Sequence, residues 1–254
     1  MKIDSILILA AGKGTRLKPY TDKCPKSLLP LGDTNVLRNL IMQSQNYFPG
    51  VEIFINASYL AEKIIEEISN FPLKNRPHVI WERNLLGPAF TVTNHCNKVD
   101  GNVLVLHGDT FFSDLTYSKL AYSINHKIHD VSLLLCHKRD KQNARSRIIE
   151  SGGIIKSIEE ITNDGSKKHI QEKKDFERVW SSSGALVVKR KSLSFFTPEI
   201  AASLSPSLIN FIAGIESLYL EECADVRLAI DSEKSYLSAI ELIKACKNLF
   251  YRTF

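Results

Sequence analysis

"LAAGKGTRLKPYTDKCPKSLLPLG", residues 9–32, begins at the end of an apolar run and contains three glycines, one arginine and four lysines. In an open parallel sheet, ligands bind beyond the carboxyl ends of the strands, which is where this stretch leaves the strand expected at residues 5–10. Gly12 and Gly14 allow backbone N–H groups to converge on an anion without interference from Cβ atoms. The stretch therefore predicts a loop that binds phosphate oxygens, while a plain tight turn explains the glycines alone equally well.

Two common phosphate loops do not fit this stretch. A dinucleotide-binding G-x-G-x-x-G pattern requires glycine at position 17, where the chain has Leu17. A Walker A loop requires glycine five positions before Gly12, where the chain has Leu7. The glycines therefore belong to neither of these classes.

Apolar runs outside the loop predict the fold. In the first half they alternate with segments of helical period, which is typical of parallel strands joined by crossover helices. We expect strands at residues 5–10, 51–57, 78–83 and 102–109, and helices at residues 34–48, starting at Thr34, and 59–71. In the second half we expect strands at residues 130–138, 146–151, 153–160 and 183–190, then helical segments around a strand at 226–232, and a last helix at 233–250. The short connections there favour antiparallel pairs, so the chain predicts an α/β fold with a mixed, mostly parallel central sheet flanked by helices.

Composition excludes several classes of protein. The chain has 254 residues, of which 44% are hydrophobic and 24% charged, enough for one large domain with a core. No apolar stretch reaches the roughly 18 residues of a membrane span, and the N-terminal apolar segment is too short for a signal peptide, so we expect a cytoplasmic protein. The five scattered cysteines indicate neither a disulfide framework nor a zinc site. A net charge of +5 suits phosphorylated small molecules and does not call for nucleic acid.

The residues after the two glycines complete a longer pattern. Residues 12–30, called the signature loop below, read G-x-G-T-R-L-x-P-x-T-x-x-x-P-K-x-L-x-P. In this pattern the chain resembles the sugar-1-phosphate nucleotidyltransferases, also called nucleoside-diphosphate-sugar pyrophosphorylases. The resemblance implies a Rossmann-like, GT-A-like fold and transfer of a nucleotidyl group from a nucleoside triphosphate to a sugar 1-phosphate, with release of pyrophosphate and with Mg²⁺ as cofactor. It also predicts one domain, residues 1–254, with a nucleotide-binding half (1–110) and an acceptor-binding half (111–254).

The chemistry of this reaction explains the two cations of the loop. The acceptor phosphate is already anionic, so the difficulty lies in bringing two polyanions together and stabilising the departing pyrophosphate. Arg16 offers a planar fork for the β- and γ-phosphates, and Lys26 offers a point charge between the α-phosphate and the acceptor phosphate. We expect both to be catalytic. The resemblance assigns nucleotide contacts to the loop itself, at Ala10, Ala11, Gly12, Gly14 and Thr15.

Two aspartates are candidate ligands for Mg²⁺. Asp109 ends the strand expected at 102–109, in the place of the family's G-D pair. Asp231, in LAIDSEKSYLSA, resembles the family's second metal aspartate before the last helix. Two carboxylates suit a hard cation that keeps several waters and also binds substrate phosphates. A helix-capping role for Asp231 or Ser232 is the alternative.

The resemblance places base recognition at residues 81–92, WERNLLGPAFTV. It assigns Glu82 to the base and Gly87 to a close backbone approach, although Pro88 and Phe90 depart from the family pattern. A carboxylate at this position would accept hydrogen bonds from guanine or from the amino group of cytosine. An exposed Glu82 without a ligand is an equally open interpretation.

The acceptor-binding half matches the family less well. The resemblance assigns Glu160 to a sugar hydroxyl and Gly184 to close contact with the sugar. Arg145 and Arg147 stand near a segment where the family has tyrosine and glycine, and they are explained either by a further anionic group on the acceptor or as solvated arginines. The charged segment 162–178 reads as a surface loop or as a substrate lid.

The expected partners are a nucleoside triphosphate and a sugar 1-phosphate, with no nucleic acid and no membrane, and an oligomer stays open. Two other functions stay open as well. One is a cytidylyltransferase acting on a non-sugar phosphate such as phosphocholine. The other is a catalytically silent relative that binds nucleoside triphosphate.

Overall fold

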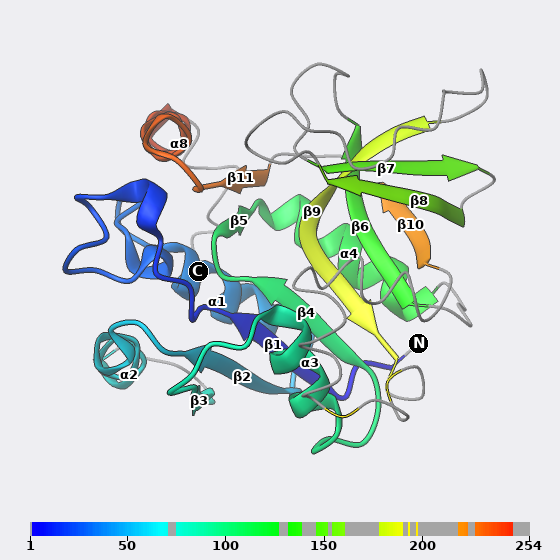
Figure 1. Ribbon diagram of the computed structural model, residues 1–254, viewed down its shortest axis with the longest axis horizontal. Helices are drawn as coiled ribbons and strands as arrows, with labels where there is room; N and C mark the ends of the chain where they lie inside the picture. The colour runs from blue at the N-terminus through cyan, green and yellow to red at the C-terminus, as the bar shows by residue number, and fades with distance from the viewer. Residues whose placement is uncertain are drawn as a thin grey trace.

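The computed structural model of the chain describes residues 2–70, 75–126, 132–138, 146–151, 154–160, 178–189, 193, 197, 218–222 and 227–245. Its centre is a nine-stranded sheet in the order β3-β2-β1-β4-β9-β6-β10-β8-β7 (Figure 1). The strands are β1 (Ser5–Leu9), β2 (Glu52–Ala57), β3 (His78–Trp81), β4 (Val103–His107), β6 (Ser132–Lys138), β7 (Ser146–Ser151), β8 (Ile154–Glu160), β9 (Arg178–Val188) and β10 (Leu218–Glu222).

The first half of the chain forms the parallel part of this sheet. β1 lies between β2 and β4 and is parallel to both, and β3 adds a parallel edge strand. The helices here are α1 (Val36–Tyr47), α2 (Ala61–Asn70), α3 (Pro88–Cys96) and α4 (Asp114–His126). The alternation predicted from the apolar runs is therefore confirmed.

The second half turns the sheet into a mixed one, as predicted. β9 is antiparallel to β4 and β6, and β8 is antiparallel to β10 and β7, so these two strands run opposite to the others. A separate two-stranded ladder joins β5 (Thr110–Phe112) to β11 (Arg227–Ala229). After it comes α8 (Glu233–Ala245), where the last helix was expected.

Several details differ from the sequence prediction, four of which concern the start of a helix or the type of an element. Asn35, not Thr34, caps α1, because its side chain accepts from the backbone N–H of Arg38. α2 begins at Ala61, since Leu60 has a positive φ of 51°. α3 was not predicted; it starts at Pro88 after Gly87, and glycine before a helix with proline at its first position is a common helix start. β10 lies where a helical segment was expected, paired between β6 and β8.

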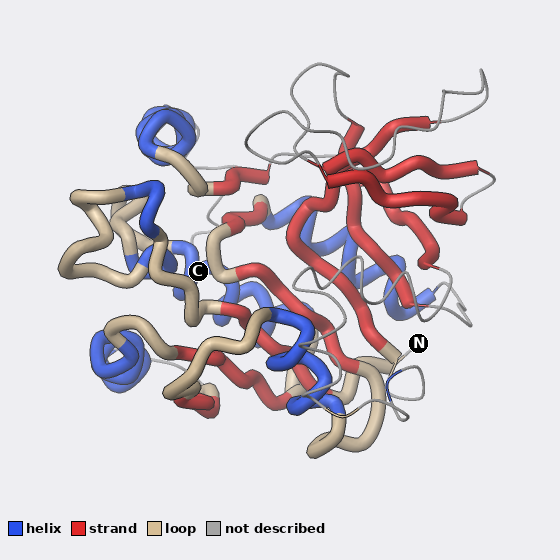
Figure 2. Tube along the Cα trace, in the orientation of Figure 1, coloured by secondary structure: helices blue, strands red, loops and turns tan. Residues whose placement is uncertain are grey.

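Helices cover both faces of the parallel part, which directs ligands to the ends of its strands. Ile6 and Ile8 of β1 belong to the hydrophobic cluster that includes α1, α2, α4 and α8, whereas Leu7 points into the cluster beneath α3. Figure 2 shows α3 on the near side of the strands, with other helices behind them. Both faces are therefore filled by side chains, and open space is left at the strand ends. Among the described residues, no helix is long and apolar enough to cross a membrane.

Candidate active site

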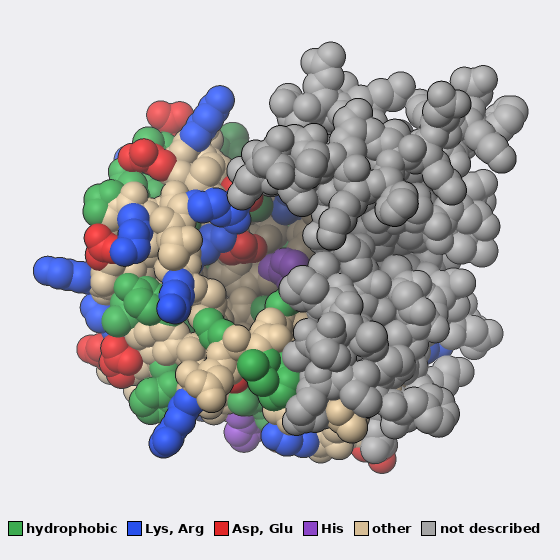
Figure 3. Space-filling view, in the orientation of Figure 1, with side chains coloured by type: hydrophobic (Ala, Val, Ile, Leu, Met, Phe, Trp, Pro, Cys, Tyr) green, Lys and Arg blue, Asp and Glu red, His purple; other side chains and the backbone are tan. Residues whose placement is uncertain are grey.

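A cavity of about 360 Å³ opens at the carboxyl ends of β1 and β4. Figure 3 shows this hollow with basic, acidic and histidine side chains gathered at its walls. The residues that line it are Leu9, Ala10, Gly12, Gly14, Thr15, Arg16, Leu17, Lys26, Ser27, Pro88, His107, Gly108, Asp109 and Asp231. The structure thus brings together the signature loop and both predicted metal aspartates.

The two loop glycines are required for different reasons. Gly14 has a left-handed backbone (φ 62°), and an added Cβ would lie 2.9 Å from Thr21 Cγ2. The Thr21 hydroxyl also donates to the Gly14 carbonyl (2.8 Å), which closes the turn. At Gly12 an added Cβ would meet no atom within 4 Å. Gly14 therefore shapes the loop, whereas the space at Gly12 leaves its backbone accessible from the cavity.

Lys26 and Asp109 form a close ion pair inside the cavity. Lys26 Nζ lies 2.6 Å from Asp109 Oδ2, and the other carboxylate oxygen accepts from the Thr110 hydroxyl at 3.1 Å. Burial acts to raise the pKa of Asp109, but Lys26 and the surrounding donors outweigh it, so the pKa lies below its ordinary value. Burial also lowers the pKa of the neighbouring His107, which favours a neutral imidazole at neutral pH. The pair therefore favours the charged form of the Asp109 carboxylate.

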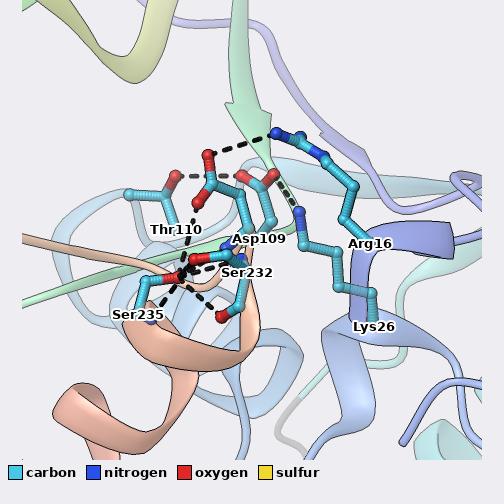
Figure 4. Close-up of polar contacts among 7 residues, drawn as sticks. Arg16, Lys26, Asp109, Thr110, Ser232 and Ser235 are labelled. Carbon is cyan, nitrogen blue, oxygen red and sulfur yellow. Dashed lines mark hydrogen bonds and ion pairs between the residues drawn. The ribbon is translucent and has the colours of Figure 1, made fainter. Parts of the chain in front are cut away.

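The second pair joins Arg16 to Asp231. Arg16 Nη1 lies 3.8 Å from Asp231 Oδ2, and the two side chains are 52% and 41% exposed. Ser232 caps α8, because its hydroxyl accepts from the backbone N–H of Ser235. The capping alternative therefore applies to Ser232, while Asp231 Oδ1 accepts from the Ser235 hydroxyl at 3.4 Å and Oδ2 faces Arg16. Figure 4 shows Arg16 and Lys26 extending from the same side toward Asp109 and the start of α8.

The backbone fixes the two aspartates relative to each other. The β5–β11 ladder pairs Ala229 with Thr110, and the Ile230 N–H donates to the Asp109 carbonyl at 2.9 Å. Asp109 and Asp231 thus flank the same end of one ladder and line one cavity. Among the described residues no three His, Cys, Asp or Glu side chains gather as a metal cluster. Two hard carboxylates, each already facing a cation, fit a Mg²⁺ ion that also binds waters and phosphates.

Glu82 follows β3 and is absent from the lining of the cavity. It is 8% exposed, and its carboxylate oxygens make no hydrogen bond of good geometry, although the side chains of Thr91 and Asn56 lie close enough to favour the charged form. Burial raises its pKa, because the charged form is poorly solvated there. The exposed alternative for Glu82 is therefore wrong. Gly87, with φ 97°, precedes α3, and its neighbour Pro88 lines the cavity.

The acceptor-side residues are described only in part. Gly184 of β9 has φ 87°, and an added Cβ would lie 2.8 Å from Thr110 Oγ1, so this glycine lets β9 pass close behind the cavity wall. Glu160 ends β8, and the structure describes its backbone but not its side chain. The same holds for the Arg147 side chain, and Arg145 and the segment 162–178 lie outside the described residues altogether.

Two further residues contribute to the site or support it. His107, which ends β4, lines the cavity beside Asp109. Asn56, at the end of β2, accepts a hydrogen bond from the Ala10 backbone (2.7 Å) and so holds the start of the loop. A polar residue ending an apolar strand on the ligand side is the signal that could have indicated both. Ala11, also predicted to contact nucleotide, is buried beside the cavity and does not line it.

Comparison with known proteins agrees with this site. A sequence profile of the nucleotidyl transferase family matches residues 5–187, well over half of the chain. The bifunctional protein GlmU of Methanococcus maripaludis (strain S2) is 24% identical over an alignment 257 residues long, gaps included. The alignment covers 87% of this chain and 61% of that protein. The match to the GlmU of another strain of this species covers 46% of this chain and 27% of that protein, so the chain aligns with only part of these longer relatives.

Solved structures share the fold. The UDP-glucose pyrophosphorylase from Acinetobacter baumanii superposes with a TM-score of 0.70 at 15% identity, covering 98% of this chain and 96% of that one. The CTP:phosphocholine cytidylyltransferase from Streptococcus pneumoniae gives a TM-score of 0.69 at 17% identity, covering 94% and 98%. These neighbours confirm the predicted GT-A-like fold, and the family profile includes the whole signature loop and Asp109. The chain belongs to the nucleotidyl transferase family.

Proposed function

We propose that this protein transfers a nucleotidyl group from a nucleoside triphosphate to a sugar 1-phosphate and releases pyrophosphate. The observation that carries the proposal is the convergence of two cations of the signature loop with two carboxylates in one cavity. Such a set matches the charges of a triphosphate and its metal ion. Similarity to GlmU and to a UDP-glucose pyrophosphorylase supports the class of reaction. A cytoplasmic location is part of this proposal, since both substrates are metabolites.

In this reaction an oxygen of the acceptor phosphate attacks the α-phosphorus in line. A bond forms between this oxygen and the α-phosphorus while the bond to the bridging β-phosphate oxygen breaks, and the electron pair leaves with pyrophosphate. The nucleophile is already anionic, so no side chain has to remove a proton and His107 is not needed as a base. Lys26 would reduce the repulsion between the two phosphates, and Arg16 would bind the departing pyrophosphate.

Asp109 and Asp231 would hold a Mg²⁺ ion, which neutralises charge on the triphosphate when bound. The same carboxylates face Lys26 and Arg16, so the four side chains are neutral as a set. A triphosphate would take the cations from the carboxylates and leave two negative charges exposed to the metal. Nucleotide and metal are therefore expected to strengthen each other's binding.

The nucleobase is proposed to lie near Gly87 and Pro88, at the start of α3. Glu82 follows β3, and burial of its carboxylate is costly because Thr91 and Asn56 compensate for it only in part. A base edge that donates N–H groups, as in guanine or cytosine, would supply further partners if the segment after β3 opened toward it. This is the basis for proposing a guanine or cytosine nucleotide rather than one with an acceptor-rich edge.

A second candidate is a cytidylyltransferase acting on a non-sugar phosphate such as phosphocholine. Two observations favour it: the departures from the family pattern around Arg145 and Arg147, and the shared fold with the phosphocholine enzyme. The nucleotide-binding half would act in the same way for both acceptors.

Pyrophosphate release tests these proposals. Each of the four nucleoside triphosphates is combined with Mg²⁺ and with a panel of sugar 1-phosphates and phosphocholine. Release that depends on one sugar 1-phosphate supports the first proposal, and release with phosphocholine supports the second. Tight binding of nucleoside triphosphate without turnover on any acceptor contradicts both and indicates a silent relative.

A further inference from the structure

The signature loop is attached to α8 at two places, one near each of its cations. Tyr236 of α8 donates its hydroxyl to the carbonyl of Pro30 (2.9 Å), which ends the turn that carries Lys26. Tyr20, four residues after Arg16, donates to the carboxylate of Glu233 (3.1 Å), the first residue of α8. The rings of Tyr20 and Tyr236 also meet edge to face, with centroids 5.4 Å apart.

These contacts matter because the backbone already fixes the position of α8 relative to both aspartates. Asp231 directly precedes the helix, and the β5–β11 ladder ties it to Asp109. The loop cations have no comparable backbone link to the aspartates, since among the described pairings the loop contributes only the isolated bridge between Leu31 and Thr34 that follows it. The two tyrosines therefore supply a connection between the cations and the carboxylates that secondary structure does not provide.

We infer that Tyr236, assisted by Tyr20, is a positioning residue for the proposed reaction: it holds the signature loop at the distance from α8 at which Lys26 and Arg16 reach the phosphates bound beside Asp109 and Asp231. The inference rests on the proposed function, because it concerns the same cavity. Tyr236 itself does not line that cavity and is 5% exposed, so it acts through the loop and not on the substrate. On the opposite side of the loop, the Tyr59 hydroxyl contacts the carbonyls of Thr21 and Asp22 at 2.9 and 3.0 Å, so the loop is held between two elements.

Replacing Tyr236→Phe keeps the buried ring and removes the hydroxyl that binds Pro30. The dissociation constant of a fluorescent triphosphate analogue in Mg²⁺ is measured together with kcat and KM for both substrates. We expect nucleotide affinity and kcat/KM for the nucleotide to fall roughly tenfold, because small displacements of catalytic groups have large effects. The KM for the acceptor should change less than the nucleotide affinity, since of the two displaced cations Lys26 alone is expected to face the acceptor phosphate.

Tyr47→Phe is the matched control. Tyr47 donates to Asp114 at 2.8 Å and joins α1 to α4, away from the cavity. Like Tyr236→Phe, this variant removes a tyrosine hydroxyl from the same hydrophobic cluster. We expect it to lower the melting temperature by a similar amount and to leave nucleotide affinity unchanged.

A double-mutant cycle separates positioning from general stability. In a Lys26→Ala background, Tyr236→Phe should weaken nucleotide binding by less than about threefold, because Lys26, the nearer of the two cations that it positions, is missing and only Arg16 remains. An unreduced tenfold loss in that background overturns the inference, as does no loss in the wild-type background. Tyr20→Phe gives a second variant that leaves the core intact, since Tyr20 is 38% exposed. A smaller loss is expected there, and it should vanish in an Arg16→Ala background.

The binding measurements keep this inference distinct from the proposed reaction. A protein that binds triphosphate but transfers no nucleotidyl group contradicts the proposed reaction, and the cycle can still be measured. A protein that turns over but shows no coupling between Tyr236 and Lys26 contradicts only the positioning role. Absence of triphosphate binding contradicts both.

Discussion

Lys26 Nζ lies 2.6 Å from Asp109 Oδ2, although the two residues are 83 positions apart in the chain. The ammonium occupies a carboxylate oxygen that the proposed metal ion would also need. Lysine and metal therefore compete for Asp109, and this competition can be measured directly.

Lys26→Met removes the ammonium and keeps an apolar stem of similar length. We expect turnover to fall at least about 100-fold, as for the loss of a group that stabilises transition-state charge. Binding of Mn²⁺ by the protein alone should become roughly fivefold tighter, because Asp109 loses its competing cation. Titration of Mn²⁺ by calorimetry or electron paramagnetic resonance measures this change. Lys18→Met, which removes a surface pair with Asp22 outside the cavity, is the control, and unchanged or weaker Mn²⁺ binding in Lys26→Met would contradict the competition.

Asp231→Asn and Ser232→Ala should have opposite consequences. Asp231→Asn is expected to reduce metal-dependent nucleotide binding with little change in stability, since its ion pair with Arg16 is largely solvent-exposed. Ser232→Ala removes the cap of α8 and should cost about 1 kcal/mol of unfolding free energy. Urea unfolding and nucleotide titration of both variants provide the comparison. Equal losses of stability would show that Asp231 is mainly a capping residue.

Gly14→Ala and Gly12→Ala separate loop shape from access to the cavity. Gly14→Ala should destabilise the protein by about 1–2 kcal/mol, because alanine is strained at a φ of 62° and its Cβ would press on Thr21. Gly12→Ala should leave the melting temperature nearly unchanged, since its Cβ meets no atom within 4 Å, but it should weaken binding of nucleoside triphosphate. Thermal melts and equilibrium nucleotide binding test the pair. Full nucleotide affinity in Gly12→Ala would place the phosphates elsewhere.

Glu82→Gln should make the protein more stable at neutral pH. The pKa of Glu82 is raised in the folded state by burial, so the folded protein holds its proton more tightly than the unfolded chain does. The favourable contribution of the protonated acid is complete below the unfolded pKa and is lost as pH rises through the folded pKa. Glutamine cannot ionise, so its advantage should grow with pH over that range and disappear in acid.

Urea unfolding of wild type and Glu82→Gln between pH 4 and pH 8 measures this difference. Glu66→Gln, at an exposed position of α2, is the control and should change nothing. A constant difference between the Glu82 variant and wild type at every pH would show that Glu82 does not titrate in this range.

The parallel half of the fold was predictable because its strands are buried on both faces and read as continuous apolar runs. The start of α3 was not, because Gly87 and Pro88 serve either a loop or a helix start, and packing against Leu7 and Val105 decides between them. β10 was missed for a related reason: a short strand in a mixed sheet depends on partners that are distant in the chain.

The residues of the site also divide into those that the sequence could predict and those that it could not. Arg16 and Lys26 could be predicted because the signature loop is one continuous pattern, and Asp109 because it ends an apolar strand. The burial of Glu82 could not be predicted, since it depends on packing with side chains that are distant in the chain, such as Asn56. The pairing of Lys26 with Asp109, and not with Asp231, depends on side-chain geometry that no local pattern contains.

The β5–β11 ladder makes the cavity a late product of synthesis. A nascent chain could assemble the glycine turn and the lysine–aspartate contact once its first 110 or so residues had emerged from the ribosome. Asp231 and Tyr236 come from residues 227–245, and this segment must pair with β5 near the middle of the chain. A fragment ending before residue 227 is therefore expected to retain much of the parallel layer but to lack activity, because it contains neither Asp231 nor Tyr236.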